Sequence, residues 1–479
     1  MGLGYDLLFR EFAERVEYYR SLGVNPFSLA TGCAVKVDLV DVLYPALKSI
    51  RSELEVLGLT IAPRRDADVF SADPGSLRVL REVYDAEDPL VDAERLRAFS
   101  PLRAIVLAQV HQSLASGPEP FREVVRRFYS RIAEAVEGRI IVGKGHSIVS
   151  AHSKSQFFLV DYVSYERGEA LAAANNDTIQ IIDPAEDPGS PRQAAVAVAN
   201  SLNDLFTVGA WRNIRVYPVY DAPSVGLKSR IRANMESYVE KLGGSFVDTV
   251  QPGRGSLLMG ASVFAELRGK PPFFYDRVEP GMELLATRPF GELAIINVYM
   301  LAMLDREIAG ELEAQTGVSV GELLELKNSV VDLMAKPNVE VARVIEGRLP
   351  GVGEDFNPKE HIAVTTDVTG PGIYVIKEIA ELSNVSIRVD EIPLISPVLS
   401  EFATRNFIIP NATAGTNGAI VILASKQVIE GVEEELRKAG ESPVRVGLVV
   451  SRGEARVKAP QKLRKYIAAK SYLKEFELS

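Results

Sequence analysis

The 479 residues of this chain suffice for two or three domains, and its 47% hydrophobic and 25% charged residues are ordinary proportions for a globular protein. The formal net charge of −10 argues against general nucleic-acid binding. One cysteine excludes an internal disulfide, and no apolar run approaches the ~20 residues that span a bilayer, so we expect a cytoplasmic protein without a membrane segment.

The first part of the chain is predicted to be helical. Apolar spacing predicts a helix over 5–23, whose interspersed charges are those of an amphipathic helix and no signal peptide, and a second helix over 39–55. A loop, 24–38, lies between them. The segment 60–138 has apolar residues at helical spacing near its end, and we interpret it as a helical insertion. It is a lid, a partner surface or a packing addition.

From residue 139 the pattern changes to that of strands, which predicts an α+β domain over 139–280 with an antiparallel sheet. Helices are expected at 190–208 and 225–243. The expected strands are 139–142, 148–151, 156–162, 170–174, 178–182, 214–220 and 256–267.

A second unit is predicted over 281–479, with strands and helices alternating in an α/β arrangement. The expected helices are 291–314, 319–335, 338–347 and one after Gly370, and the expected strands are one after Gly281 and those at 361–366, 385–392, 418–424 and 444–451. The tail from Arg452 to Lys474 has eight basic residues and one acid. A solvated helix face is expected there, with RNA binding as the alternative.

Three acidic residues stand where predicted elements begin or end. Asp204 lies near the end of an amphipathic helix, four residues after Asn200, Asp177 follows Asn176 at a strand start, and Asp367 lies beside Thr369 in a Thr-Thr-Asp-Val-Thr-Gly run. Hard oxygen ligands on several elements suit Mg²⁺ bound to a polyphosphate. The alternative is that each is a helix-cap or turn acid.

At these positions the sequence resembles a known superfamily. The run Asn200–Ala210 is similar to the "NALSD-[IL]-[YF]-A-M-G" helix of the aminoimidazole ribonucleotide synthetase superfamily. Thr366–Gly370 matches its "TDVTG" motif, and Glu279–Gly291 resembles its "xPGDxLLLTKPLG" motif. The three motifs occur in the family's order at compatible spacing.

Within that superfamily, the segment Thr31–Lys36 resembles the "G-[C/U]-G-C-K" loop of the selenophosphate synthetases. The family's reactive Cys or Sec lies three residues before an essential Lys, and Cys33 and Lys36 keep that spacing. A cation beside a thiol favours the thiolate, and the same Lys can neutralise a phosphate. The alternative is that Cys33 is a packed hydrophobe and Lys36 a solvated cation.

The sequence also departs from the family. Ala34 and Val35 replace the loop's Gly and second Cys, and His146 and Ser147 stand where an acidic "G-x-G-D-D-A-A-V" strand is expected. One metal-binding acid is therefore lost or moved. The outline of a P-loop at Gly138–Lys144 lacks the Ser or Thr that must follow and is interpreted as a strand, although Lys144 in its Gly-rich turn can touch a phosphate. The four histidines have no zinc spacing with the lone Cys. A structural role is expected for His146, and the alternative is a functional one, since it stands where the family has an acid.

The resemblance implies a two-domain aminoimidazole ribonucleotide synthetase-like fold that binds ATP between its domains and acts as a homodimer. Mg²⁺ is expected on Asp177, Asp204 and Asp367, and Asn176, Asn200, Lys144 and Thr369 are expected at the nucleotide. The implied reaction converts ATP, selenide and water into selenophosphate, AMP and phosphate. The alternatives are a related kinase or ATP-dependent synthetase with an organic acceptor, and a nucleotide-binding protein without turnover.

Overall fold

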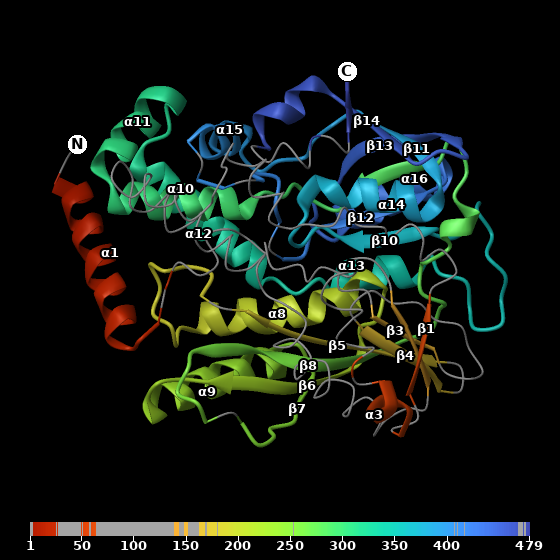
Figure 1. The fold of residues 1–479 in the computed structure, drawn as a ribbon, viewed down its shortest axis with the longest axis horizontal. Coiled ribbons are helices and arrows are strands. Elements are labelled where there is room, and N and C mark those ends of the chain that lie inside the picture. Colours follow the sequence, from red (N-terminus) through yellow and green to blue (C-terminus); the bar gives the residue numbers. More distant parts are fainter. Residues whose placement is uncertain are drawn as a thin grey trace.

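The computed structural model contains two β-sheets with helices packed against them (Figure 1). It describes residues 3–24, 26, 49, 51–56, 59–63, 138–142, 148–151, 162–167, 170–179, 181–251, 253–406, 408–409, 411–415, 417–467, 473 and 476–479. Cys33, Lys36, Lys144 and His146 lie outside these residues, as does nearly all of the predicted insertion 60–138.

The first sheet has eight strands in the order β1-β2-β3-β4-β5-β8-β6-β7. Its antiparallel centre pairs β4 with β5, β5 with β8 and β8 with β6, as predicted, whereas β1–β2, β3–β4 and β6–β7 are parallel pairs. The strands are β1 Leu59–Pro63, β2 Gly138–Val142, β3 Ile148–Ala151, β4 Tyr162–Arg167, β5 Ala170–Ile179, β6 Arg212–Asp221, β7 Ser245–Phe246 and β8 Leu258–Leu267.

Two helices, α8 (Pro191–Thr207) and α9 (Val225–Lys241), pack side by side on this sheet, and α8 faces the second sheet (Figure 1). The α8 helix begins where the Ser190 hydroxyl accepts a hydrogen bond from the Gln193 amide. It ends at Thr207, and Gly209, just beyond the C-cap residue Val208, has a left-handed φ of 80°. A Cβ atom there would lie 3.1 Å from the Glu346 backbone nitrogen, so glycine fits both the turn and the close approach.

The second sheet has seven strands in the order β10-β12-β9-β13-β11-β14-β15. Its first five strands are paired antiparallel, and β14 and β15 extend it in parallel. The strands are β9 Glu283–Ala286, β10 Val364–Asp367, β11 Val385–Val389, β12 Ile420–Ala424, β13 Val444–Arg452, β14 Arg456–Ala459 and β15 Glu477–Leu478.

The helices of this half include α10, which is almost completely buried because its residues are apolar on every side. It packs against α12, α11 and α15, while α12 and α13 also contact α8. The helices are α10 Glu292–Leu304, α11 Arg306–Thr316, α12 Val320–Ala335, α13 Val339–Glu346, α14 Val375–Ser383, α15 Pro397–Arg405 and α16 Lys426–Lys438.

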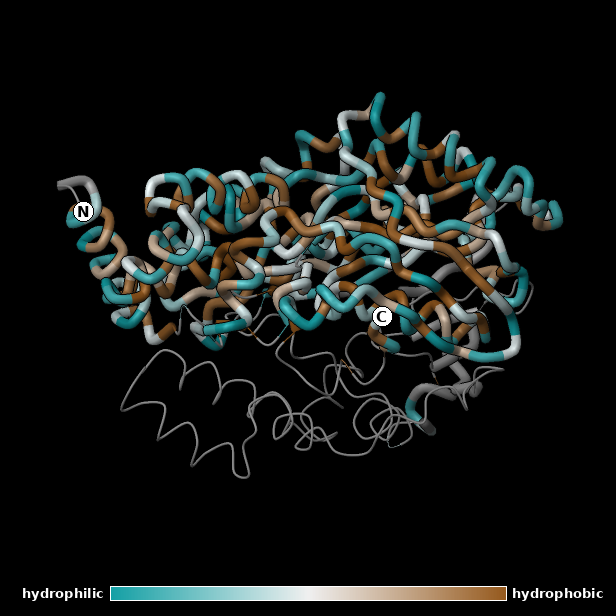
Figure 2. The backbone as a smooth tube through the Cα atoms, turned by 90° about the horizontal axis from the view of Figure 1, so that it is seen from above, coloured by the Kyte–Doolittle hydropathy of each residue, from teal (hydrophilic) through white to brown (hydrophobic). Residues whose placement is uncertain are grey.

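Helix α1 (Leu3–Ser21) connects the two halves at one end of the molecule (Figure 1). The Tyr5 hydroxyl donates to the Ala302 carbonyl of α10 at 2.7 Å, and the Tyr19 hydroxyl donates to the Glu186 carbonyl, which follows β5, at 2.7 Å. A short helix, α3 (Arg51–Val56), precedes β1. Apolar segments gather inside and hydrophilic segments on outer helices and turns (Figure 2). None of the described helices combines the length and hydrophobicity of a membrane span.

The structure confirms the α+β class and corrects several predicted elements. One strand, β5, covers 170–179 where two were expected, because its antiparallel pairing with β8 runs unbroken from Leu171 to Ile179. The expected helix 291–314 is two helices, since Asp305 ends α10 and caps α11 through its side chain. The described part of the basic tail is not one α-helix: Arg456–Ala459 pair with β11 as β14, and Gln461–Lys465 form a 3-10 helix.

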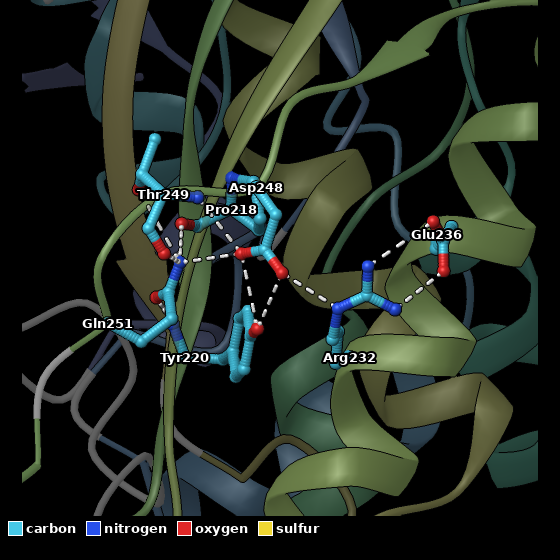
Figure 3. A network of polar contacts seen from close by, with 7 residues as sticks. All are labelled: Pro218, Tyr220, Arg232, Glu236, Asp248, Thr249 and Gln251. Carbon is cyan, nitrogen blue, oxygen red and sulfur yellow. Dashed lines mark hydrogen bonds and ion pairs between the residues drawn. The ribbon is translucent and has the colours of Figure 1, made fainter.

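The loop between β7 and β8 is attached to β6 and α9 by a polar network (Figure 3). The Asp248 carboxylate accepts from the Tyr220 hydroxyl at 3.0 Å, from Arg232 Nε at 2.7 Å and from Gln251 Nε2 at 3.1 Å. Arg232 also pairs with Glu236 at 2.8 Å, one turn further along α9. Side-chain hydrogen bonds to β6 and α9 therefore hold this loop in place.

Candidate functional site

The predicted acids of β5 and α8 face one another through a reciprocal pair of hydrogen bonds. Asn200 of α8 donates its side-chain amide to Asp177 of β5 at 2.5 Å. Asn175 of β5 donates in turn to Asp204 of α8 at 2.5 Å. Residues two apart in a strand share a face, so Asn175 and Asp177 point to the same side of β5. Residues four apart in a helix also share a face, so α8 likewise presents one amide and one acid. Each carboxylate is thus oriented by the opposite element.

Asp367 joins this pair from the second sheet. It ends β10, and its carboxylate accepts from the Thr369 backbone amide at 3.2 Å, which fixes it in a tight turn. The Thr365 hydroxyl donates to the Thr207 carbonyl at 2.6 Å and so holds β10 against the end of α8. Asp177 and Asp367 therefore lie close enough for their charges to interact, and α8, which carries Asp204, packs against both β5 and β10.

The environment of Asp177 reflects this crowding. Burial raises the pKa of Asp177 to about 6, against the opposing hydrogen bonds from Thr178 and Asn200, and the charge of Asp367 raises it further. Two carboxylates that repel one another in a half-buried position are stabilised by a cation between them. The donor set, all oxygen and drawn from separate elements, fits Mg²⁺, with Asp177, Asp204 and Asp367 as the residues that would hold it.

A second segment supports the turn that follows Asp367. The Asn411 side chain donates to the Pro371 carbonyl at 3.0 Å, and the Thr413 hydroxyl accepts from the Ile373 amide at 3.1 Å. Gly372 has a φ of 59°, and a Cβ atom there would lie 2.4 Å from the Thr413 carbonyl oxygen, so no larger residue fits. The turn is therefore fixed by buried contacts on its far side.

Buried amides connect α8 to the second half. Asn203 hydrogen-bonds with Asn417 and accepts from Asn338 Nδ2 at 3.0 Å, and Asn417 donates to the Met334 carbonyl at 2.6 Å. All three amide side chains are buried. Satisfied buried amides fix a unique arrangement of the elements that carry them, because any displacement leaves a polar group unpaired.

A buried ion pair lies beside the amide network. Arg288 pairs with Glu292 at 2.5 Å and also donates to the Asn417 carbonyl. The sequence drew attention to the segment around Arg288 only through its motif, and neither side chain was predicted to contribute.

The remaining predicted residues are placed less completely. Asn176 lies in β5, where its backbone pairs with Ser262, and Thr369 forms a bridge to Gly415. Cys33, Lys36 and Lys144 lie outside the described residues, so their roles stay predictions. Asn175 was not among the predicted site residues, although its position two residues before Asp177 in a strand places both side chains on one face.

One histidine lies within a group of possible metal ligands. Glu354, Glu360 and His361 each offer an atom within 4.8 Å of the others. However, Nδ1 of His361 accepts a hydrogen bond from the Asn357 backbone amide at 2.9 Å. The neutral ring must then carry its proton on Nε2, which leaves no nitrogen lone pair for a metal.

Comparison with known proteins adds the following. No protein-family model matches the chain. A selenide, water dikinase of Methanocaldococcus jannaschii is 24% identical over 294 residues, covering 58% of this chain and 78% of that protein. Among solved structures, tt0281 of Thermus thermophilus matches 62% of this chain and 88% of its own at 14% identity, with a TM-score of 0.47. The Aquifex aeolicus thiamine monophosphate kinase matches 64% and 92% at 12% identity, with a TM-score of 0.44.

The sequence match and the order of the motifs agree. The chain is therefore similar to a selenide, water dikinase, as its motifs predict, and it has the α+β architecture that this resemblance implies.

Proposed function

We propose that this protein is an ATP-dependent phosphotransferase that transfers a phosphoryl group to selenide or a related chalcogen. The observations that support the reaction class are that Asp177 and Asp204 are each oriented by an amide of the opposite element and that the charge of Asp367 acts on Asp177. Phosphoryl transfer depends mainly on positioning and charge neutralisation, which such a cluster provides. The substrate assignment is supported by the similarity to a selenide, water dikinase.

In this proposal ATP lies between the two halves, with its phosphates held through Mg²⁺ by the three acids. When bound, the Mg²⁺ would neutralise charge on the phosphates. Asn176, Asn200, Lys144 and Thr369 are proposed to contact the nucleotide. Lys36 is proposed to neutralise the transferred phosphate, and Cys33 to handle the chalcogen as a thiolate. A homodimer in the cytoplasm is part of the same proposal.

The test is product analysis under anaerobic conditions with the full-length protein, MgATP and sodium selenide. We expect selenide-dependent release of AMP and phosphate together with selenophosphate, one of each per ATP consumed. ADP release with an organic acceptor instead of selenide would assign the protein to a kinase-type reaction. Tight ATP binding without turnover would identify a nucleotide-binding protein, consistent with the loss of acids at His146 and Ser147.

The acid cluster is tested separately by Asp204→Asn and Asp367→Asn. Each removes one charge from the proposed Mg²⁺–phosphate site and is expected to lower metal-dependent turnover, or nucleotide binding, roughly a hundredfold or more. The matched control is Asp276→Asn, whose carboxylate is 78% exposed and pairs only with Arg277 among the described residues. If both cluster variants bind and turn over ATP like the parent protein while remaining folded, this assignment of the site is wrong.

A further inference from the structure

A pocket lies where the two halves of the molecule meet, away from the acid cluster. It has a volume of about 410 Å³ and is lined by the end of α9, by α13 and by the segments that flank β6 and β8. Three arginines, Arg212, Arg268 and Arg343, line it together with Trp211, and none of its lining residues that the structure describes is acidic. Its size is that of a small-molecule site, and its lining is strongly basic.

One carboxylate organises this pocket from behind. Glu346 is nearly buried and accepts from Trp211 Nε1 at 2.8 Å, from Arg212 Nη2 at 2.7 Å and from the Arg268 backbone amide at 2.8 Å. It thereby fixes the indole ring and one guanidinium. On α13, Arg343 and Glu346 are three residues apart, so they lie on the same side of the helix.

The indole ring in turn orients two arginines. The guanidinium carbon of Arg212 lies 4.1 Å from the centroid of the Trp211 ring, and that of Arg343 lies 4.4 Å from it. Stacking of this kind restricts long side chains that would otherwise sample many rotamers. Preorganised guanidinium groups lose less entropy when they bind an anion.

The backbone of β6 is also distorted at this pocket. Asn213 has a φ of 51°, and the pairing with β8 shifts register between Arg212 and Arg215. A left-handed conformation is costly for a residue with a side chain, and bulges of this kind redirect neighbouring side chains. The bulge lies directly beside Arg212 in the pocket wall.

Three carboxylates lie beside the three arginines: Glu346 at Arg212, Glu340 at Arg343, and the partly exposed Glu266, which accepts a hydrogen bond from the pocket residue Asn213 at 2.6 Å. Glu346 offsets Arg212, and Glu340 pairs with Arg343 at 2.8 Å, but that pair is about half exposed and is screened by water. Arg268 is exposed and has no ion pair among the residues that the structure describes. The guanidinium groups of Arg212 and Arg343, together with Arg268, which has no ion pair among the described residues, offer several N–H donors and positive charge. A phosphate group, with several oxygens and two negative charges, suits such a set of donors.

We propose that this pocket binds a small organic phosphate at a site distinct from the acid cluster. Arg268 follows the end of β8, seven residues beyond Ala261, which pairs with Asp177. At about 3.3 Å per strand residue the two sites are roughly 20 Å apart. A bound phosphate would contact β6 and β8 of the first half and α13 of the second. The site does not depend on the reaction proposed above.

Trp211 gives a direct measurement, because it is the chain's single tryptophan. The metal-free, full-length protein is titrated with inorganic pyrophosphate, with tryptophan emission and isothermal titration calorimetry recorded in parallel so that binding without an optical change is still detected. We expect a saturable response that Arg268→Ala weakens roughly tenfold or more, since a charge-assisted hydrogen bond is lost. The control Arg277→Ala removes an exposed arginine of another surface and should leave the affinity unchanged.

Two further arms decide the assignment. Asp204→Asn is expected to leave this pyrophosphate affinity unchanged, which separates the pocket from the acid cluster even if the proposed function fails. Citrate, as a multivalent carboxylate, is expected to bind at least tenfold more weakly. The inference is overturned if neither method detects saturable binding, if Arg268→Ala binds like the parent protein, or if citrate competes equally well.

Discussion

At the scale of single residues, the acid cluster depends on how each carboxylate is held. Asp177 lies in a half-buried position near a second negative charge, and that raises its pKa to about 6. A carboxylate of this kind is ionised only at a cost that a bound cation can offset. Burial of Asp177 near the charge of Asp367 therefore favours binding of a cation, and it destabilises the folded protein when no cation is bound.

This cost predicts a pH dependence of stability. Because the pKa of Asp177 is above its ordinary value of 3.8, its stabilising contribution is complete below pH 3.8 and is lost as the pH rises through about 6. In metal-free protein we expect roughly 1 to 3 kcal/mol of unfolding free energy to disappear between these values. Asp177→Asn should lack this component, and Mg²⁺ should restore stability at pH 7.5 in the parent protein only. Urea unfolding at several pH values measures both, and identical pH profiles for the two proteins would contradict the interpretation.

Asn175 offers a second test at this scale. Its side-chain amide donates to the Asp204 carboxylate at 2.5 Å and to the Ser201 carbonyl at 3.0 Å. Asn175 therefore positions Asp204 and is not itself proposed as a metal ligand. Asn175→Ala should raise the KM for MgATP more than it lowers kcat, by roughly tenfold, because Asp204 loses the hydrogen bond that Asn175 donates to it. Asn175→Asp should be worse than Ala, since it adds a like charge beside Asp204. Steady-state kinetics would contradict this role if both variants match the parent protein.

At the scale of elements, α8 is the central component. It contacts β5 and β8 beneath it, α12 and α13 beside it, and β10 of the opposite sheet. Its amide and acid residues therefore reach both halves from one rigid helix. A site built on helices and strands is held more accurately than one built on loops, and only the Asp367 turn here depends on a loop.

The loop between β7 and β8 gives the element-scale prediction (Figure 3). Burial by itself raises the pKa of Asp248, but the hydrogen bonds from Arg232, Tyr220 and Gln251 outweigh it and hold the pKa below its ordinary value. Its stabilising contribution is thus present above pH 3.8 and lost as the pH falls through the lowered value. Asp248→Asn should lower Tm at pH 7, and the difference from the parent protein should shrink toward pH 3.

The control for this loop is Asp276→Asn, which removes an exposed acid from a pair with little expected stability. We expect its Tm to stay within about 1 °C of the parent value. A pH-independent loss of Tm in Asp248→Asn would show that shape, and not charge, holds the loop.

At the scale of the whole molecule, a buried ion pair joins the two halves. Lys327 of α12 donates to Asp183, which follows β5, at 2.6 Å, and both side chains are almost completely buried. Lys327→Met leaves an unpaired buried carboxylate and should cost about 3 to 5 kcal/mol of unfolding free energy. The double variant Lys327→Met with Asp183→Asn should recover a large part of that loss. Additive effects in denaturant unfolding would contradict a direct coupling between these two charges.

The sequence by itself indicated several of the long helices and singled out three acids as candidate metal ligands, a role that stays a prediction. Periodic apolar spacing located α1, α8, α9 and α12 to within two residues, because an amphipathic helix needs no distant partner to be recognised. Motif order placed Asp177, Asp204 and Asp367, and it predicted the resemblance that the comparison with a selenide, water dikinase confirms. The domain boundaries and the roles of Cys33, Lys36 and Lys144 stay predictions.

Only the tertiary structure decided how these residues meet. The reciprocal amides of Asn175 and Asn200, the network around Asn203 and the basic pocket at Trp211 join residues far apart in the chain. The β14 strand in the basic tail likewise exists because β11 supplies its hydrogen-bond partners. The local sequence does not reveal these partners. The hydrogen-bonding groups of a strand edge or a buried amide pair with whichever distant groups the fold places beside them.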